Sequence, residues 1–246
     1  RIKEDSKPDA IVNSWWDFGH WFKYWTDRAV TFDGTTQNTD QAHWIGRALL
    51  TGSEKEAIAI LRMLDCGDRR GFEILSKVTD DGTEAVSTLK QIILLDREEA
   101  KKVLTRKFDE NFSESLLGKT HCEPPEDYFI TSEDMVGKSG VWSHFGSWDF
   151  DRALVYNTLK KKEYGNDLDK SVRFLQERFG YSKNNAEKLF YEVQSITTSD
   201  RANNWIAPWP GYAGSAGCGK MDNLTLSCAI SGIPLVVNLS TNEAYA

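Results

Sequence analysis

The chain has 246 residues, which is enough for one large domain or two small ones. A hydrophobic content of 40% can supply a core, and a net charge of −7 argues against nonspecific nucleic-acid binding and against a polybasic membrane-surface patch. No run of about 18 apolar residues is present, so no segment is predicted to span a bilayer. The chain opens at Arg1 without a Met or a visible signal peptide, and we expect it to be part of a longer protein.

Short apolar runs and aromatic clusters dominate the start of the chain. Residues 10–12 predict a buried strand, and the aromatic spacing that follows predicts a helix beginning near Asp17 or Phe18. Residues 29–32 predict a second strand, which ends at a turn of Asp and Gly.

Helical periodicity fills the middle of the chain. We expect helices over residues 39–50, 53–64, 70–78, 82–95 and 97–108. Ser53 and Glu56 are typical of a capping box at the start of the second of these helices. Residues 128–131 predict a strand that leads into a helix, with Thr131 or Ser132 as its N-cap. Further helices are expected over residues 148–162, 168–179 and 183–196.

The last 45 or so residues lose the helical period. Residues 224–226 and 235–239 predict two strands, and the glycine-rich residues 211–217 predict a flexible loop. We therefore expect an α-rich α+β fold, with a helical central core, a few short strands and a small C-terminal β segment. Residues 1–200 would form the core domain, and residues 201–246 would pack on it.

Four cysteines are present, and none of them lies in a CxxC pair. With only four His, the tetrahedral zinc patterns are absent as well. The cysteines could form two disulfides in three connectivities, of which Cys218–Cys228 would close a local loop. Buried free thiols explain the same spacing equally well.

The sequence lacks the common catalytic motifs, since it has no G-x-S-x-G, P-loop, Rossmann glycine or H-E-x-x-H pattern. Its most unusual segment is Trp15-Trp16-Asp17-Phe18-Gly19. A Ser or Thr hydroxyl could donate to Asp17 and accept from an indole N–H, while the ring faces exclude water from the contact. The alternative is a core Trp pair with Asp17 as a helix cap, and the residues taken alone favour it.

Two further polar segments have simple explanations. Asp134 and Lys138 stand at positions i and i+4 of a predicted helix and therefore share a face, where an exposed ion pair of small energy accounts for them. The polar residues 33–39 are accounted for as a turn followed by a helix cap.

Together, these segments resemble the catalytic subunit of oligosaccharyltransferase, and its archaeal forms in particular. Residues 14–19 match the SWWDYG signature of that family, with Phe18 where Tyr is usual, and residues 31–46 resemble its continuation. Residues 134–138 resemble the DK helix motif, at a spacing that fits only a variant form. The resemblance covers roughly residues 10–150.

The resemblance implies a glycosyltransferase in which a many-helix membrane domain is joined to a water-facing domain, and this chain looks like the latter. In the family, the WWD tripeptide binds the hydroxyl of the +2 Ser/Thr in an Asn-X-Ser/Thr sequon. Trp15, Trp16 and Asp17 would inherit that role, and Lys138 would line the same pocket. Asp134 and Met135 would support the pocket from the same helix.

The resemblance places catalysis outside this chain. No catalytic residue, metal or cofactor is expected in it, because the acidic residues and a divalent Mg²⁺ or Mn²⁺ ion would be held by the membrane domain. The expected partners are an acceptor polypeptide and, through that domain, a lipid-linked oligosaccharide, with no nucleic acid. The domain would lie on the extracytoplasmic face of the cell membrane, where its own sequons at Asn111, Asn223 and Asn238 could be acceptors.

Two other functions remain open. An aromatic-rich carbohydrate-binding module would need its aromatic side chains exposed in a groove. A helical interaction domain would need a purely structural WWD, with Trp16 and Asp17 buried and unavailable. Exposure of both in one polar pocket would favour the sequon-binding interpretation.

Overall fold

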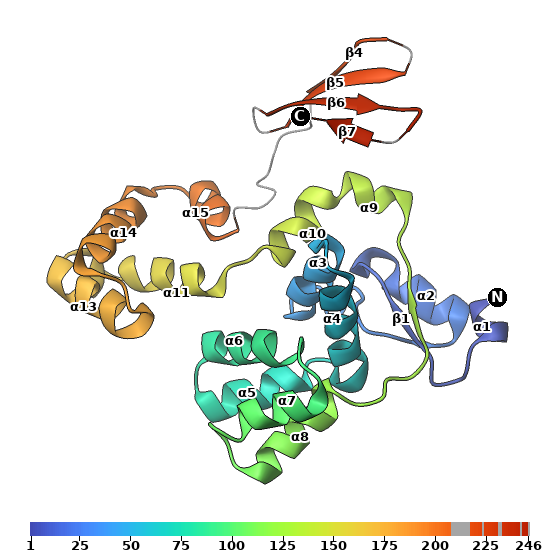
Figure 1. Cartoon of the computed structure of the whole chain (residues 1–246), viewed down its shortest axis with the longest axis horizontal. Helices are drawn as coiled ribbons and strands as arrows, with labels where there is room; N and C mark the ends of the chain where they lie inside the picture. Colours follow the sequence, from blue (N-terminus) through green and yellow to red (C-terminus); the bar gives the residue numbers. More distant parts are fainter. Residues whose placement is uncertain (208–216, 223, 231–232, 242, 246) are drawn as a thin grey trace. The chain divides into compact units, whose positions relative to one another are not determined.

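The computed structural model of the chain describes residues 1–207, 217–222, 224–230, 233–241 and 243–245 (Figure 1). Its backbone contacts divide the chain into two units, Arg1–Trp209 and Pro210–Ala246. The first unit is mostly helical and the second carries an antiparallel sheet, so the predicted α-rich α+β class is confirmed. The division expected after residue 200 and the packing of the tail stay predictions. Residues 211–216 of the expected loop lie outside the described residues.

A small parallel sheet holds the first unit together at its N-terminal end. Its central strand β1 (Ile11–Asn13) pairs with β2 (Ala29–Val30) on one side and with β3 (Asp127–Phe129) on the other. All three strands were expected from the sequence. The chain leaves β1 into a short 3-10 helix, η1 (Trp16–Phe18), and then into α2 (Gly19–Thr26).

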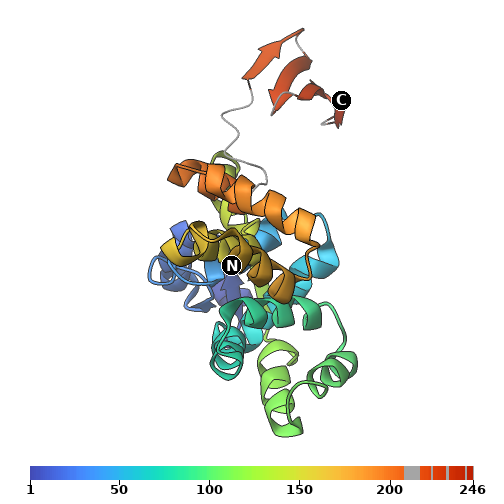
Figure 2. The same ribbon diagram turned by 90° about the vertical axis from the view of Figure 1, so that its left-hand side faces the viewer.

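Helices fill the chain between β2 and β3. They are α3 (Gln41–Leu50), α4 (Glu54–Gly67), α5 (Arg70–Thr79), α6 (Gly82–Ile92), α7 (Arg97–Leu104) and α8 (Glu110–Thr120). Figures 1 and 2 both show α5 to α8 gathered at one end of this unit. The first five helices were expected, and Ser53 caps α4 as predicted. The sequence did not predict α8, because Ser113, Ser115 and Gly118 interrupt its apolar stripe.

More helices follow β3. They are α9 (Glu133–Gly137), α10 (Ser139–Gly146), α11 (Phe150–Leu159), α12 (Lys162–Gly165), α13 (Leu168–Phe179), α14 (Lys183–Ser195) and α15 (Ser199–Ile206). The short helices α12 and α15, and α1 (Ile2–Asp5) at the N-terminus, were not predicted. Among the described residues, no helix has both the length and the apolar content needed to cross a membrane.

The second unit is an antiparallel sheet of β4 (Gly217–Lys220), β5 (Thr225–Ile230), β6 (Ile233–Asn238) and β7 (Glu243–Tyr245). Cys218 on β4 lies opposite Cys228 on β5, and the two form the disulfide that their spacing suggested. The other disulfide joins Cys66 in α4 to Cys122 just after α8, across 56 residues of sequence. Both predicted strands of this segment are confirmed.

Two glycines allow α3 and α10 to pack against each other. A Cβ atom on Gly46 would lie 2.3 Å from the carbonyl oxygen of Trp142, and one on Gly146 would lie 2.4 Å from the backbone of Gly46. Such distances are far below ordinary van der Waals contact. The absence of side chains at both positions therefore fixes how closely the two helices approach.

A polar cluster around the buried Asn13 anchors β1 just before the WWDFG segment. The side chain of Asn13 is fully buried, and its amide donates to Asp65 of α4 at 2.8 Å and to Asp127 of β3 at 2.7 Å. Its amide oxygen accepts from the hydroxyl of Thr31. Burial, and then the neighbouring charge of Asp127, raise the pKa of Asp65 to about 7, although the hydrogen bond from Asn13 opposes this shift.

The packing of α3 on α10 predicts that Gly46→Ala destabilises the protein. Alanine favours a helix over glycine, so any loss of stability must come from the clash with Trp142. We expect the free energy of unfolding to fall by about 1–3 kcal/mol, measured by urea denaturation with circular dichroism. Gly118→Ala in α8 is the matched control, because that glycine also lies in a helix and a Cβ there meets nothing within 4 Å. Equal effects of the two substitutions would rule out the close approach.

The half-buried Asp65 predicts a pH-dependent stability. Between the ordinary pKa of 3.8 and the folded value of about 7, the native chain holds a proton that the unfolded chain releases, so stability falls as pH rises through this window. Asp65→Asn removes this loss, and we expect the variant to be more stable than the parent by roughly 1–3 kcal/mol at pH 8. Denaturation at pH 5 and at pH 8 measures the difference, which should shrink at pH 5. The exposed Asp9→Asn control should show no such change.

Candidate functional site

The WWDFG segment divides its side chains between the core and the surface. Trp15 is 2% exposed, and its ring lies edge-on to Phe32 at 5.2 Å between ring centroids. Trp16 and Asp17 are half-buried, and the ring of Phe18 is 36% exposed. Trp15 is therefore a core side chain that fixes the segment, whereas the next three residues reach the surface.

The glycine that ends the segment is required by packing. A Cβ atom on Gly19 would lie 2.4 Å from the carbonyl oxygen of Phe32, so only glycine lets α2 begin against this turn. The turn itself is stabilised by Asp33, which accepts hydrogen bonds from the backbone N–H and the hydroxyl of Thr35. Burial opposes ionisation of Asp33, but these hydrogen bonds outweigh it and lower the pKa. The predicted polar turn is thus confirmed as a structural element.

Lys138 brings the two motifs together. Its ammonium nitrogen lies 2.8 Å from Oδ1 of Asp17 and 2.8 Å from Oδ2 of Asp134. The hydrogen bond to Asp134, and then the one to Asp17, raise the pKa of Lys138. The same nitrogen lies 5.5 Å from the ring centroid of Phe18, which the sequence had not singled out as a contact. The pair expected between Asp134 and Lys138 is therefore one half of a three-residue ion cluster.

Asp17 does not act as a helix cap. Phe18 occupies the N-cap position of α2, and no side chain caps that helix. The carboxylate of Asp17 instead points toward Lys138, with 22% of the side chain exposed. Its second oxygen, Oδ2, is buried and accepts no hydrogen bond from any described residue. The indole N–H groups of Trp15 and Trp16 likewise find no partner within the described part of the chain.

The helix that carries Lys138 is fixed from beneath. Met135 is buried in the same hydrophobic core as Trp15, and its carbonyl oxygen accepts a hydrogen bond of 2.8 Å from the indole of Trp142. The hydroxyl of Ser132 donates to Asp134 at the start of α9. These contacts restrict the position of α9, and so they restrict where the Lys138 ammonium can lie.

Sheet topology explains why these distant residues meet. β1 and β3 are parallel neighbours, so their carboxyl ends lie at the same edge of the sheet. The chain leaves one of these ends toward Asp17 and the other toward Lys138. Ser14, which follows β1, is hydrogen-bonded to Ile130, which follows β3: its hydroxyl donates to the carbonyl oxygen of Ile130 at 2.8 Å. Ligand sites of open parallel sheets commonly form at such an edge.

We next considered metal-binding groups and the buried histidine His43 among the described residues. No group of three or more His, Cys, Asp or Glu side chains among them is arranged to hold a metal ion. His43 is buried, and burial followed by the charge of Lys90 lowers its pKa to about 3, so it is neutral. Buried polar atoms without a partner include Oδ2 of Asp40 and Nε2 of His43 in residues 31–46 as well as Oδ2 of Asp17. Asp17 differs from the other two because Lys138 joins its carboxylate to the second motif.

Comparison with known proteins identifies related sequences. The family model described as the STT3/PglB/AglB core domain matches residues 8–152, which include both motifs. A dolichyl-phosphooligosaccharide-protein glycotransferase of Methanocaldococcus jannaschii is 36% identical over 168 residues, which are 65% of this chain and 18% of that protein. A protein of the same name from Methanococcus voltae is 37% identical over 156 residues, 61% of this chain and 17% of that protein.

The alignments cover most of this chain but only a small part of its relatives. The chain spans less than a fifth of the length of these curated relatives, and no solved structure matches it. The family match itself covers more than half of the chain, so the predicted resemblance to archaeal oligosaccharyltransferases is confirmed. This chain belongs to the STT3/PglB/AglB core-domain family.

Proposed function

We propose that this chain is the water-facing acceptor-recognition domain of an oligosaccharyltransferase, and that it binds the hydroxyl of the +2 Ser/Thr of an Asn-X-Ser/Thr sequon. The observation that carries the proposal is Oδ2 of Asp17, a buried carboxylate oxygen to which no described residue donates a hydrogen bond. A buried acceptor without a donor is costly, since it loses water and gains nothing. A ligand that donates a hydrogen bond there removes this loss.

A hydroxyl group fits the available atoms. Asp17 offers an acceptor, and Trp16 offers an indole N–H whose donor capacity is unused among the described residues. A Ser or Thr hydroxyl donates and accepts at once, so it satisfies both. A side chain without a hydroxyl, such as Val, would leave both unsatisfied. The site would therefore discriminate Ser and Thr from Val, because Val would leave these polar atoms without a hydrogen-bond partner.

Lys138 would position the carboxylate. Its ammonium occupies Oδ1 of Asp17, which leaves Oδ2 as the free acceptor. The aliphatic stem of Lys138 and the ring of Phe18, over which the ammonium lies, would face the methyl group of a bound Thr. Trp15 would contribute mainly by fixing the backbone of the segment, because its ring is buried.

Transfer itself would need the rest of a longer enzyme. The relatives' names point to a dolichyl-phosphate-linked oligosaccharide as donor. We infer that the membrane domain holds this donor, together with acidic residues and a divalent Mg²⁺ or Mn²⁺ ion that supplies charge stabilisation. The acceptor carboxamide nitrogen would attack the anomeric carbon with inversion, and the lipid (pyro)phosphate would leave. This domain would then act on the extracytoplasmic face of the membrane.

The proposal predicts a hydroxyl-dependent interaction with Asp17. We expect millimolar Asn-X-Thr peptide to shift the NMR signals of residues 16–18 and of Lys138, and the Asn-X-Val peptide to leave them unchanged. Asp17→Asn should weaken binding about tenfold to a hundredfold, the range for a hydrogen bond to a charged group. Asp9→Asn removes the same charge at an exposed position and should leave the affinity unchanged.

Two outcomes would contradict the proposal. Equal shifts with the Thr and Val peptides would show that the hydroxyl is not recognised. Equal affinity of the Asp17→Asn variant and the parent would show that Oδ2 is not the acceptor. A transfer assay with the longer enzyme carrying the same substitution provides the second measurement, in which the KM for acceptor peptide should rise.

A further inference from the structure

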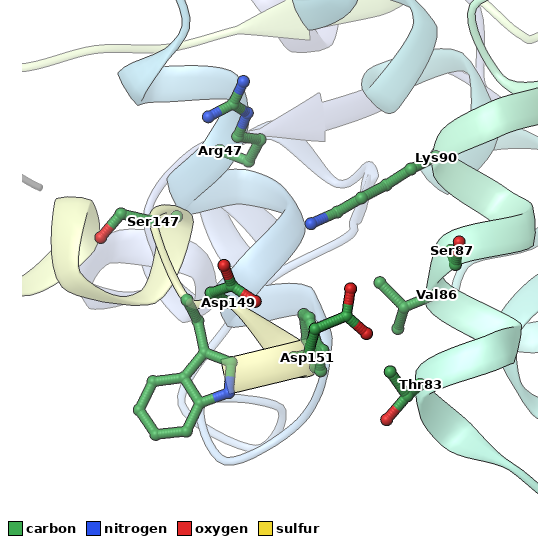
Figure 3. Close-up of a pocket in the computed structure, with 11 residues that line it drawn as sticks. Arg47, Thr83, Val86, Ser87, Lys90, Ser147, Asp149 and Asp151 are labelled. Atoms are coloured by element: carbon green, nitrogen blue, oxygen red, sulfur yellow. The ribbon is translucent and has the colours of Figure 1, made fainter. Parts of the chain in front are cut away.

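A second polar pocket lies within the first unit, away from the Asp17 cluster. It occupies about 300 Å³ between α3, α6 and the start of α11, close to the lower limit for small-molecule sites. Its lining combines two cations, two acids, three hydroxyl side chains and two aromatic rings (Figure 3). None of Asp17, Asp134 and Lys138 lines it. Its chemistry is therefore separate from the proposed sequon site.

Lys90 is the unusual member of this lining. Its ammonium has no carboxylate partner among the described ion pairs, whereas the other cation of the pocket, Arg47, is paired with Glu56 at 2.7 Å. The Lys90 nitrogen lies 5.4 Å from the ring centroid of Phe150. Burial, and then the charge of Arg47, lower the pKa of Lys90. The charges of Asp149, Asp151 and Glu56 oppose this shift. None of these carboxylates makes a described ion pair with Lys90, whose side chain is exposed, so an anionic group of a ligand could contact the ammonium.

Two acids face the same space. In Figure 3 the carboxylates of Asp149 and Asp151 and the ammonium of Lys90 point into one cavity. Asp149 caps α11 by accepting from the backbone N–H of Arg152 at 2.9 Å. Burial, and then the charge of Asp149, raise the pKa of Asp151, whereas the charges of Arg178 and Lys90 oppose this shift.

This mixture argues against a simple ion as the ligand. A small inorganic anion on Lys90 would be repelled by the two carboxylates of the lining and would bring no set of hydrogen-bond donors to offset that repulsion. A metal ion attracted to the carboxylates would face Lys90 and Arg47. The lining instead suits a ligand that carries one negative group at one end and several hydrogen-bond donors at the other.

The remaining lining residues narrow the ligand class. The hydroxyls of Thr83, Ser87 and Ser147 donate and accept, as sugar hydroxyls do. Trp148 and Phe150 offer apolar faces to the C–H groups of a ring. Both rings are held in place, since Trp148 lies edge-on to His144 and Phe150 edge-on to His43.

We propose that this pocket binds an acidic sugar residue of a glycan, with its carboxylate on Lys90 and its hydroxyls donating to Asp149 and Asp151. A uronic acid supplies the anion, the donors and the apolar ring face in one small molecule. A free amino acid supplies a carboxylate and an ammonium, but it lacks the set of hydroxyls that the Ser and Thr side chains would meet. Binding here is independent of the proposed recognition of the sequon hydroxyl.

The test compares methyl β-D-glucuronide with methyl β-D-glucoside, which lacks only the carboxylate. We expect the glucuronide to give saturable NMR shifts at Ser87, Lys90 and Asp151, with at least about tenfold higher affinity than the glucoside. Lys90→Gln should abolish this preference. Lys102→Gln, which removes an exposed cation on α7, should preserve it, and so should Asp17→Asn.

Each other outcome overturns the proposal. One such outcome is that tens of millimolar glucuronide produces no saturable shift. Another is that Lys90→Gln and the parent bind the glucuronide equally. A third is that inorganic phosphate or free glutamate binds as tightly as the glucuronide. Circular dichroism of each variant shows whether the fold is kept, and Lys90→Arg provides a second variant that retains the charge and should retain the preference. Because Asp17→Asn leaves this site intact, failure here is distinct from failure of sequon recognition.

Discussion

The candidate site depends on one ammonium group that joins two segments 121 residues apart in sequence. Lys138 can reach Asp17 only because β1 and β3 are adjacent and parallel, so that both motifs leave the sheet at the same edge. The Asn13 amide strengthens this pairing from inside, since it donates to Asp127 of β3 as well as to Asp65 of α4. The hydrogen bonds of the buried Asn13 therefore support the geometry at the surface.

The WWDFG segment serves the core and the surface at once, which explains why the sequence alone favoured a structural interpretation. Trp15 packs in the core, and Gly19 lets α2 approach the turn at Phe32. Trp16 and Asp17 lie between them with unused hydrogen-bonding atoms. Trp15 and Gly19 fix the backbone, and this rigidity lets Asp17 keep a carboxylate oxygen to which no described residue donates a hydrogen bond.

Local patterns predicted most of the fold, and long-range contacts account for what they could not predict. Apolar periodicity and caps gave the strands near the WWDFG segment and the long helices from α3 to α7. They did not predict α8, whose apolar positions are interrupted by polar residues and glycine, or the four-residue α12. The Asp17–Lys138 contact followed from family resemblance, whereas nothing in the residues around Asn13 or Lys90 marks them as special. Their roles arise from neighbours contributed by other elements, which a single sequence does not reveal.

The two proposed sites are connected by one short helix. α10 begins just after Lys138 and ends at Gly146, beside Ser147 of the second pocket. Eight helical residues span about 12 Å, so the two ends of α10 keep a fixed separation. The close contact of Gly46 with Gly146 holds this helix against α3, which itself carries Arg47 of the pocket. Any movement of α10 along α3 would therefore alter the Lys138 cluster and the pocket together, and the tight glycine contact resists such movement.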